Sequence, residues 1–264
     1  MTEPTQPTSP NPLLQRAAIP GQTFALPSGG IFYTHGELDP SVQNGEVIVS
    51  PMVTLDEITM KTPDKILNGT AIAEVFQRCI PQVKNANHLL AKDVDFLLVC
   101  LRKVTYGPQY EIEYTHDCEQ AKKHSYIVPL DPLISEAKKI DASAIGNDYT
   151  ITLPNSQVVK LSPPKYFQML HFYQTFNNEV TDEEAYERLM ETTVSLVESV
   201  DDVTDKAHIM EWAKSVPAGF TRAISDQVAA VSTWGPNLKT TIQCKDCGGP
   251  IDLDVSLNPM HFFS

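Results

Sequence analysis

Ile242-Gln-Cys244-Lys-Asp-Cys247-Gly-Gly-Pro-Ile-Asp-Leu-Asp-Val-Ser-Leu257 carries two cysteines in a tight turn between two short apolar segments. A stretch with the same order of features lies far upstream and runs from Ile112 through Thr115-His-Asp-Cys118 to Pro132. Each stretch contains a strand, a cysteine-bearing turn and a returning strand, and an Asp-Pro or Asn-Pro step closes it, at Asp131-Pro132 upstream and at Asn258-Pro259 downstream. We predict that the two stretches form one split, zinc-ribbon-like β unit, and that the chain between them loops out of it.

The cysteines of the two turns predict a metal site. When the turns are aligned, Cys247 corresponds to Cys118 and Cys244 corresponds to Thr115, so three thiolates are present. Zinc readily takes three cysteines and one histidine, and a closed site of this kind contributes directly to folding. The candidates for the fourth ligand are His116 in the first turn, His124 on its returning strand and, as a weaker choice, His261.

Two other interpretations of these cysteines stay open. The ribbon can have lost its metal, in which case Thr115 marks the lost ligand and apolar packing replaces the ion. A redox function is disfavoured, because a redox Cys-x-x-Cys needs a helix N-terminus to lower the thiol pKa. Here Gly248-Gly-Pro250 follows the second cysteine instead.

The composition argues against several classes of protein. A formal net charge of −13 over 264 residues disfavours binding to a nucleic-acid backbone, which needs a basic face. Hydrophobic residues make up 42% of the chain, yet no apolar run is long enough to cross a membrane. The five cysteines are too few for a disulfide scaffold, and residues 1–12 lack the features of a signal peptide. We therefore expect a cytoplasmic protein with reduced thiols.

The patterning predicts an α+β fold with four parts. Residues 1–18 begin with a polar, proline-rich segment, which is typical of a flexible N-terminal arm. Residues 19–162 form an α+β part with the first half of the ribbon and a hairpin. Residues 163–232 have helical patterning and form an inserted lobe. Residues 233–264 supply the second half of the ribbon and complete a discontinuous core.

Local signals predict individual helices and contacts. Apolar residues at helical spacing indicate a buried helix over residues 86–104. Thr181-Asp-Glu-Glu184 is a capping box, and Thr204 is expected to cap the following helix. Arg102 is expected to pair with Asp95 or Asp93, and these acidic residues are otherwise interpreted as ordinary solvated or capping carboxylates.

Catalytic motifs are absent from the sequence. It contains no Gly-x-Ser-x-Gly, no phosphate-binding Gly-x-x-x-x-Gly-Lys-Ser/Thr, no His-Glu-x-x-His and no Gly-x-Gly-x-x-Gly. We therefore expect a protein that is not an enzyme. One alternative is a zinc-ribbon adaptor with a regulatory binding function. A less favoured one is a metalloenzyme with an open three-cysteine site, which needs a general base beside the metal.

Four stretches of the sequence carry a family resemblance. They are Leu26-Pro-Ser-Gly-Gly30 with Val49-Ser-Pro-Met-Val53, Asp93-Val-Asp-Phe-Leu-Leu98 with Leu101-Arg102 and Tyr106-Gly107, the turn at Cys118, and Gly235-Pro-Asn-Leu238 with Cys244-x-x-Cys247-Gly and Phe262-Phe263. With these stretches in this order over most of residues 24–264, the chain resembles the base-plate hub assembly proteins of T-even-type contractile-tailed bacteriophages. Thr115 departs from the pattern, because a second cysteine there would complete a four-cysteine site.

The resemblance implies a function in virion assembly. It implies a non-enzymatic protein that forms part of the tail base plate, in its hub or wedge, or that helps the hub to assemble. The implied partners are other tail and base-plate proteins, with self-association as a further possibility, and neither nucleic acid nor membrane is among them. The implied location is the host cytoplasm during assembly and, for a permanent subunit, the tail of the virion.

Overall fold

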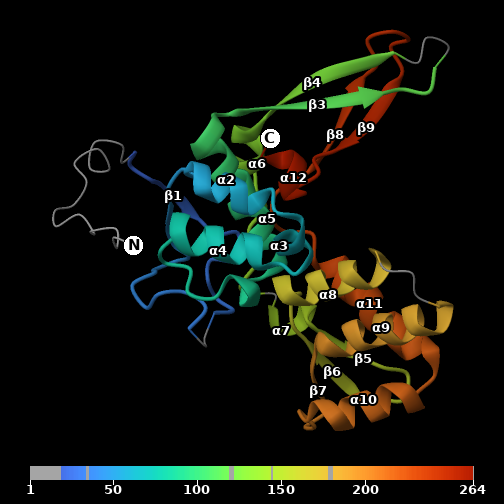
Figure 1. Cartoon of the computed structure of the whole chain (residues 1–264). Helices are drawn as coiled ribbons and strands as arrows, with labels where there is room; N and C mark the ends of the chain where they lie inside the picture. The colour runs from blue at the N-terminus through green and yellow to red at the C-terminus, as the bar shows by residue number, and fades with distance from the viewer. Residues whose placement is uncertain (1–18, 34–35, 119–121, 144, 178–180, 264) are drawn as a thin grey trace, which may run out of the picture.

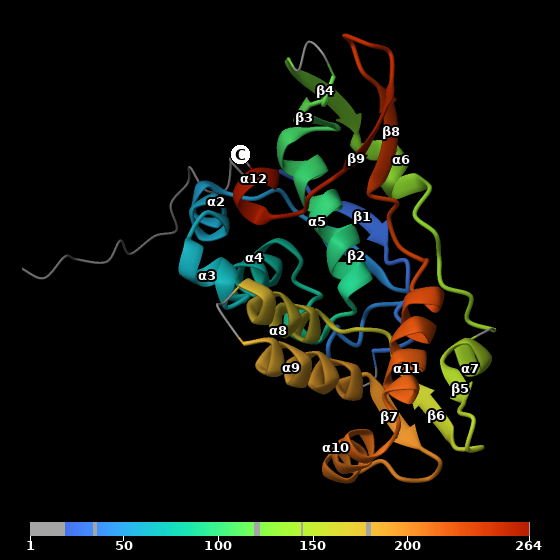
Figure 2. The same cartoon turned by 90° about the vertical axis from the view of Figure 1, so that its right-hand side faces the viewer.

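The computed structural model describes residues 19–33, 36–118, 122–143, 145–177 and 181–263, so the predicted arm over residues 1–18 lies outside the described chain. The described chain confirms an α+β fold with small antiparallel sheets. Figures 1 and 2 show three regions: a central body, a pair of β-ribbons at one end and a lobe at the other. Among the described residues, no helix is long and apolar enough to cross a membrane.

The body surrounds one buried helix, α5 (Ala91–Tyr106), and contains the largest described hydrophobic cluster. Six consecutive apolar or sulfur-containing side chains of α5, residues 96–101, are buried together with Val94, so this helix is apolar on most of its circumference. The elements that pack around it are β1 (Gln22–Ala25), β2 (Glu46–Val49), α2 (Thr54–Met60), α3 (Pro63–Leu67), α4 (Thr70–Cys79), α6 (Leu130–Ser135) and α12 (Pro259–Phe262).

The predicted helix over residues 86–104 is interrupted at its start. A 3-10 turn, η1 (Ala86–His88), comes first, and α5 begins only at Ala91. Leu90 between them is extended and forms an antiparallel bridge with Lys165. The interruption therefore serves a contact with a segment far along the chain, which helical periodicity does not reveal.

The two repeated stretches meet in space. The first forms a hairpin of β3 (Gln109–Thr115) and β4 (Lys123–Pro129), and the second forms a hairpin of β8 (Lys239–Gln243) and β9 (Pro250–Asp254). Figures 1 and 2 draw these hairpins side by side, and we call them together the double ribbon. Its own buried cluster is small and consists of Tyr114, Ile242 and Leu253.

The lobe is not helical throughout, contrary to the sequence-based prediction. It contains α7 (Ile145–Asp148), a sheet of β5 (Thr150–Thr152), β6 (Val158–Leu161) and β7 (Val197–Val200), and the helices α8 (Tyr166–Asn177), α9 (Asp182–Ser195), α10 (Lys206–Ser215) and α11 (Ala218–Val231). Val197 and Val200 are β-branched, buried and paired with β6, so this short segment completes a sheet instead of extending a helix. The hairpin β5–β6 shares one hydrophobic cluster with the helices.

The predicted helix caps have mixed outcomes. The capping box at α9 is confirmed, since the Glu184 N–H donates to Thr181 Oγ1 at 3.3 Å and the Thr181 N–H donates to the Glu184 carboxylate at 3.0 Å. Thr204 does not cap α10. Asp205 does, because its carboxylate accepts the His208 N–H at 3.0 Å, and an acceptor one residue later starts the helix one residue later.

The predicted pairing of Arg102 with Asp93 or Asp95 is wrong. Nine residues of helix separate Arg102 from Asp93, which corresponds to about 13 Å along α5. Arg102 instead donates to the Phe262 carbonyl, and its guanidinium lies 4.6 Å from the centre of the Tyr110 ring. Arg102 therefore joins the base of β3 to the C-terminal helix.

Asp93 is neither solvated nor a simple cap, because it is fully buried. Its carboxylate accepts hydrogen bonds from the Ser28 N–H at 3.1 Å, the Ser28 hydroxyl at 2.5 Å and the Tyr33 hydroxyl at 2.6 Å. Burial raises the pKa of Asp93 to about 6, although the bonds from Ser28 and Tyr33 lower it. This network fastens the loop after β1 to the first turn of α5.

Candidate metal centre

The turn between β8 and β9 points both of its cysteine sulfurs to the same side. The Gly248 N–H closes the turn on the Cys244 carbonyl at 2.9 Å, and Gly248 has the positive φ of 73° that this geometry requires. The Asp246 N–H lies 3.4 Å from Cys244 Sγ, and the Gly249 N–H lies 3.4 Å from Cys247 Sγ. Backbone donors that face both sulfurs stabilise thiolates, which are the form that binds metal.

The first turn brings one cysteine and one histidine to the same place. Thr115 ends β3 and is exposed, and the chain then bends so that the Cys118 N–H donates to the His116 carbonyl at 2.9 Å. His116 Nδ1 lies 3.2 Å from Cys247 Sγ across the two turns. One ligand atom from each of His116, Cys118, Cys244 and Cys247 lies within 4.8 Å of all the others.

This donor set fits one tetrahedral zinc ion. Zn–S distances of about 2.3 Å and a Zn–N distance of about 2.0 Å place neighbouring ligand atoms roughly 3.5–3.8 Å apart. The observed distances between the ligand atoms, from 3.2 Å for His116 and Cys247 up to 4.8 Å at most, therefore need only small adjustments to reach coordination. A Cβ at Gly249 would lie 3.3 Å from both Cys247 Sγ and His116 Cε1, so a side chain there would press tightly against two of the donor residues.

The two cysteines of the second turn have different acidities. Hydrogen bonds, first from the Cys247 N–H and then from the Asp246 N–H, lower the pKa of Cys244 to about 7 against the effect of burial. The hydrogen bond from the Gly249 N–H lowers the pKa of Cys247. Desolvation and the neighbouring Cys244 sulfur raise it by more, so the pKa of Cys247 is raised overall. A bound cation would stabilise both thiolates together.

The other two candidate histidines lie outside this group of four. His124 Nε2 is 2.7 Å from Asp246 Oδ2, so His124 contacts the second turn through a carboxylate. His261 belongs to α12 in the body and is not one of the four. Lys245 adds a second contact between this turn and β4, since its ammonium donates to the Ser125 carbonyl at 2.8 Å.

Sequence reasoning missed Asp246 and Lys245, although both lie inside the Cys-x-x-Cys motif. Their partners are on β4, and no spacing in the sequence indicates which strand faces the turn. Together with the pair of Cys247 and His116, these contacts join the two halves of the double ribbon near the candidate site.

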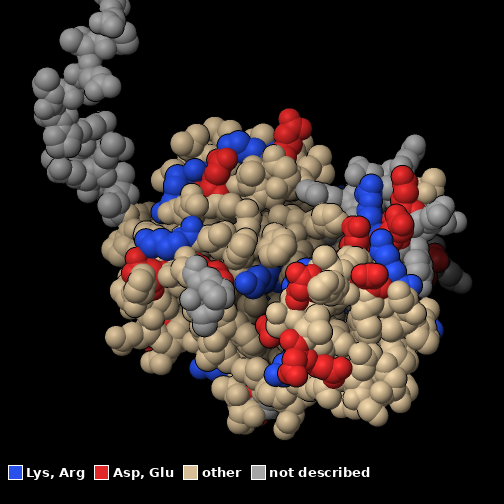
Figure 3. Space-filling view, turned by 90° about the horizontal axis from the view of Figure 1, so that it is seen from below, with Lys and Arg blue, Asp and Glu red and all other residues tan. Residues whose placement is uncertain are grey.

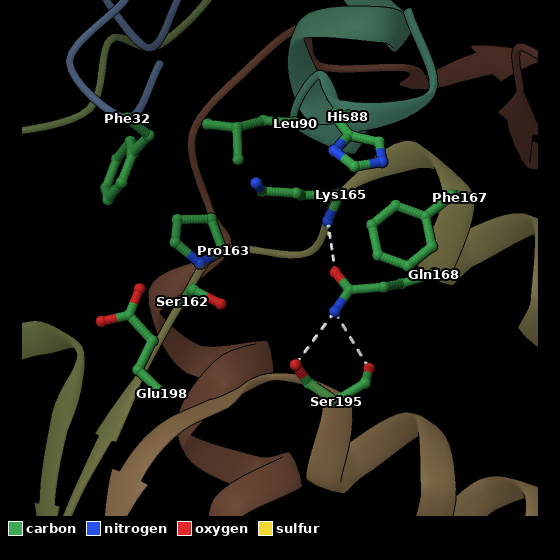
Figure 4. Close-up of a pocket in the computed structure, with 10 residues that line it drawn as sticks. All are labelled: Phe32, His88, Leu90, Ser162, Pro163, Lys165, Phe167, Gln168, Ser195 and Glu198. Atoms are coloured by element: carbon green, nitrogen blue, oxygen red, sulfur yellow. Dashed lines mark hydrogen bonds between the residues drawn. The ribbon is translucent and has the colours of Figure 1, made fainter. Parts of the chain in front are cut away.

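A pocket of 310 Å³ lies between the body and the lobe (Figure 4). The Gln168 side chain accepts the Lys165 N–H at 2.7 Å and donates to the Ser195 carbonyl at 3.1 Å. The Lys165 ammonium is 3.5 Å from the buried Glu37 carboxylate, and the His88 ring faces Phe167. These polar contacts join the start of α8 to both regions. The residues drawn in Figure 4 include no arrangement of a nucleophile with a general base.

The charges on the described surface do not form a basic face in the available view. Figure 3 shows acidic and basic side chains interspersed, without a continuous basic area on the side drawn. A phosphate-backbone site needs such an area.

The chain matches a model of a known protein family. A family model described as T4 bacteriophage base plate protein matches residues 45–263, which is well over half of the chain. The match runs from the start of β2 to the C-terminal helix and includes both hairpins of the double ribbon and the lobe. No curated protein and no solved structure matches the chain.

Proposed function

The chain belongs to the family of T4 bacteriophage base plate proteins, and from this premise we propose that it is a non-enzymatic component or assembly factor of the base-plate hub. The observation that carries the proposal is the extent of the family match, which covers the double ribbon, the body and the lobe together. In this proposal the protein acts in the host cytoplasm during assembly through interfaces with other base-plate proteins.

The proposal includes a structural zinc ion held by Cys118, Cys244, Cys247 and His116. The support is the convergence of these four side chains from two stretches that are far apart in the sequence. Four protein ligands fill a tetrahedral zinc ion and leave no position for a reacting water, so such a site supports folding and not catalysis. The metalloenzyme alternative therefore has no support in this geometry.

The zinc would stabilise the double ribbon, which has few buried apolar contacts of its own. Three buried side chains form its own cluster, and small units with so little core usually need a metal or a disulfide. The site lies near the tips of the hairpins, while Arg102, Tyr110 and Phe262 hold their bases to the body. With both its tips and its bases held, the double ribbon would keep a fixed orientation relative to the body. It would then present a rigid surface to a partner subunit.

A complementation experiment tests this function. Cells infected with a phage that lacks this gene would receive the wild-type chain, Cys118→Ser, or Asp117→Asn, which changes an exposed neighbour of the site. The wild-type chain and Asp117→Asn should restore complete base plates in sedimentation of tail intermediates, whereas Cys118→Ser should not. Normal base plates without any copy of this chain would contradict the proposal.

A further inference from the structure

The strand β3 has one open edge. Among the described strands it pairs only with β4, so no strand lies beside its other edge. The Leu130 N–H donates to the Pro108 carbonyl at 2.8 Å, and the bonded pairs of an antiparallel hairpin alternate from this pair onward. The residues of β3 whose backbone N–H and C=O groups face away from β4 are therefore Gln109, Glu111, Glu113 and Thr115. We call these backbone groups the β3 edge.

The corresponding edge of β4 is closed at two points. Pro129 lies opposite Gln109 and has no N–H to offer on that side. The Ser125 carbonyl, which also faces away from β3, accepts the Lys245 ammonium at 2.8 Å. Prolines and covering side chains are common means of preventing the addition of a further strand. The β3 edge contains no proline, so its backbone can still receive one.

The side chains beside the β3 edge are acidic. Glu111 and Glu113 are exposed and lie two residues apart in the strand, so they share one face of the hairpin. Glu113 pairs with the Lys123 ammonium at 2.6 Å. Glu111 lies opposite Ile127, which is 53% exposed, and among the described residues it has no ion pair. The face that borders the open edge therefore combines negative charge with one apolar side chain.

These charges select among possible occupants of the β3 edge. A second copy of the same strand would bring Glu111 and Glu113 beside the same carboxylates of its partner, and like charges on neighbouring strands are destabilising. A strand with Lys or Arg at alternate positions would instead place cations beside both carboxylates. In this mode of recognition the backbone hydrogen bonds supply affinity, and the alternating side chains supply specificity.

We propose that the β3 edge binds an extended segment of another base-plate protein, with Lys or Arg at alternate positions, as a third strand of the hairpin. The inference deepens the proposed function and rests on it for the source of the partner. It names the surface used and the chemistry of the segment that fits it.

A synthetic peptide tests the proposal on the full-length protein. The probe has the length of β3, alternates lysine with valine and is blocked at both ends; a second peptide replaces each lysine by glutamate. The lysine peptide should bind, and the amides of Glu111 and Glu113 should then exchange about tenfold or more slowly in nuclear magnetic resonance. The amides of Tyr110 and Ile112, already paired with β4, should change much less. The glutamate peptide should not bind.

Two variants separate the charges from the backbone. Glu111→Lys with Glu113→Lys should weaken binding of the lysine peptide about tenfold or more and allow the glutamate peptide to bind. Glu187→Lys with Glu191→Lys makes the same change in net charge at exposed positions of α9 and should leave both peptides unaffected. Glu111→Pro removes one outward N–H and no bond to β4, so it should weaken binding more than Glu111→Gln does.

Each other outcome would overturn the proposal. A lysine peptide that does not bind at millimolar concentration would mean that Glu111 and Glu113 only keep the edge unpaired. Binding without protection of their amides would be charge attraction without strand pairing. Protection of these amides in the absence of peptide, together with dimers in sedimentation, would assign the edge to a second copy. The experiment contains no phage component, so its failure would leave the result of the complementation test unchanged.

Discussion

The double ribbon and the lobe both extend from the same body, but they are stabilised differently. Among the residues that the structure describes, the lobe has a cluster of twelve buried residues, built by one sheet and several helices. The double ribbon has a cluster of three, and its two hairpins come from distant parts of the chain. Apolar burial can maintain the lobe, whereas our proposal makes the double ribbon depend on a metal ion held by the four convergent side chains near its tip.

Loss of a proposed zinc ligand is expected to have the largest effect and to separate the two regions. Cys118→Ser should abolish zinc binding and open the double ribbon, because structural zinc supplies on the order of 10 kcal/mol of binding free energy. Hydrogen exchange should rise over residues 109–129 and 239–254 and stay unchanged in the lobe. A chelator should do the same to the wild type, while Asp117→Asn should match the untreated wild type. Equal loss of protection in both regions would break the comparison.

The reciprocal change lies in the core of the lobe. Leu161→Ala removes a buried side chain of β6 and should lower the free energy of unfolding of the lobe by about 2–5 kcal/mol. Denaturant unfolding measures the change, with Lys160→Ala, an exposed neighbour, as control. The zinc content should stay at the wild-type value. If Leu161→Ala also released zinc, the two regions would not be independent.

The body should lose stability between about pH 4 and pH 6 because of one buried carboxyl group, Asp93. The pKa of Asp93 is raised to about 6 in the folded protein, above its value of about 4 in the unfolded chain. Its contribution to stability is therefore present below about pH 4 and is lost as the pH rises through 6, by roughly 2–3 kcal/mol. Asp93→Asn should gain this amount relative to the wild type between pH 4 and 7, measured by denaturant unfolding. A difference that does not change with pH would refute this role of Asp93.

The smallest expected effect is that of His124→Ala, which distinguishes the two candidate histidine ligands of the double ribbon. His124→Ala removes the contact with Asp246 and should cost about 1 kcal/mol or less, with zinc retained. His116→Ala should instead release the zinc. The zinc content and thermal unfolding of both variants distinguish the two histidines. Zinc loss in His124→Ala with retention in His116→Ala would exchange their roles.

The sequence was most informative where a feature is local. The two cysteine turns predicted a hairpin at each place, and strand β3 indeed pairs with β4 and strand β8 with β9. The capping box of α9 was predictable because Thr181 and Glu184 satisfy each other's backbone within one turn. The family resemblance was also readable, because its motifs follow one another over most of the chain, and the family match confirms a base plate protein.

Long-range contacts explain what the sequence could not show. Arg102 was assigned to carboxylates on its own helix, but its partner is the Phe262 carbonyl, 160 residues away. Similarly, β7 forms because β6 offers an edge to Val197–Val200, which no pattern within the helical stretch reveals. Both His116 and His124 contact the second turn, but only the packing of the two hairpins determines that the His116 imidazole lies beside the cysteine sulfurs and the His124 imidazole beside Asp246.

X-ray absorption at the zinc edge of the purified full-length protein tests most directly whether a metal closes the double ribbon. The four convergent side chains predict one zinc ion per chain, with three sulfur ligands at about 2.3 Å and one nitrogen ligand at about 2.0 Å. Cys118→Ser should lose this signal. Protein purified and supplied with zinc that still contains no bound metal, while its double ribbon keeps full protection from hydrogen exchange, would contradict the proposal.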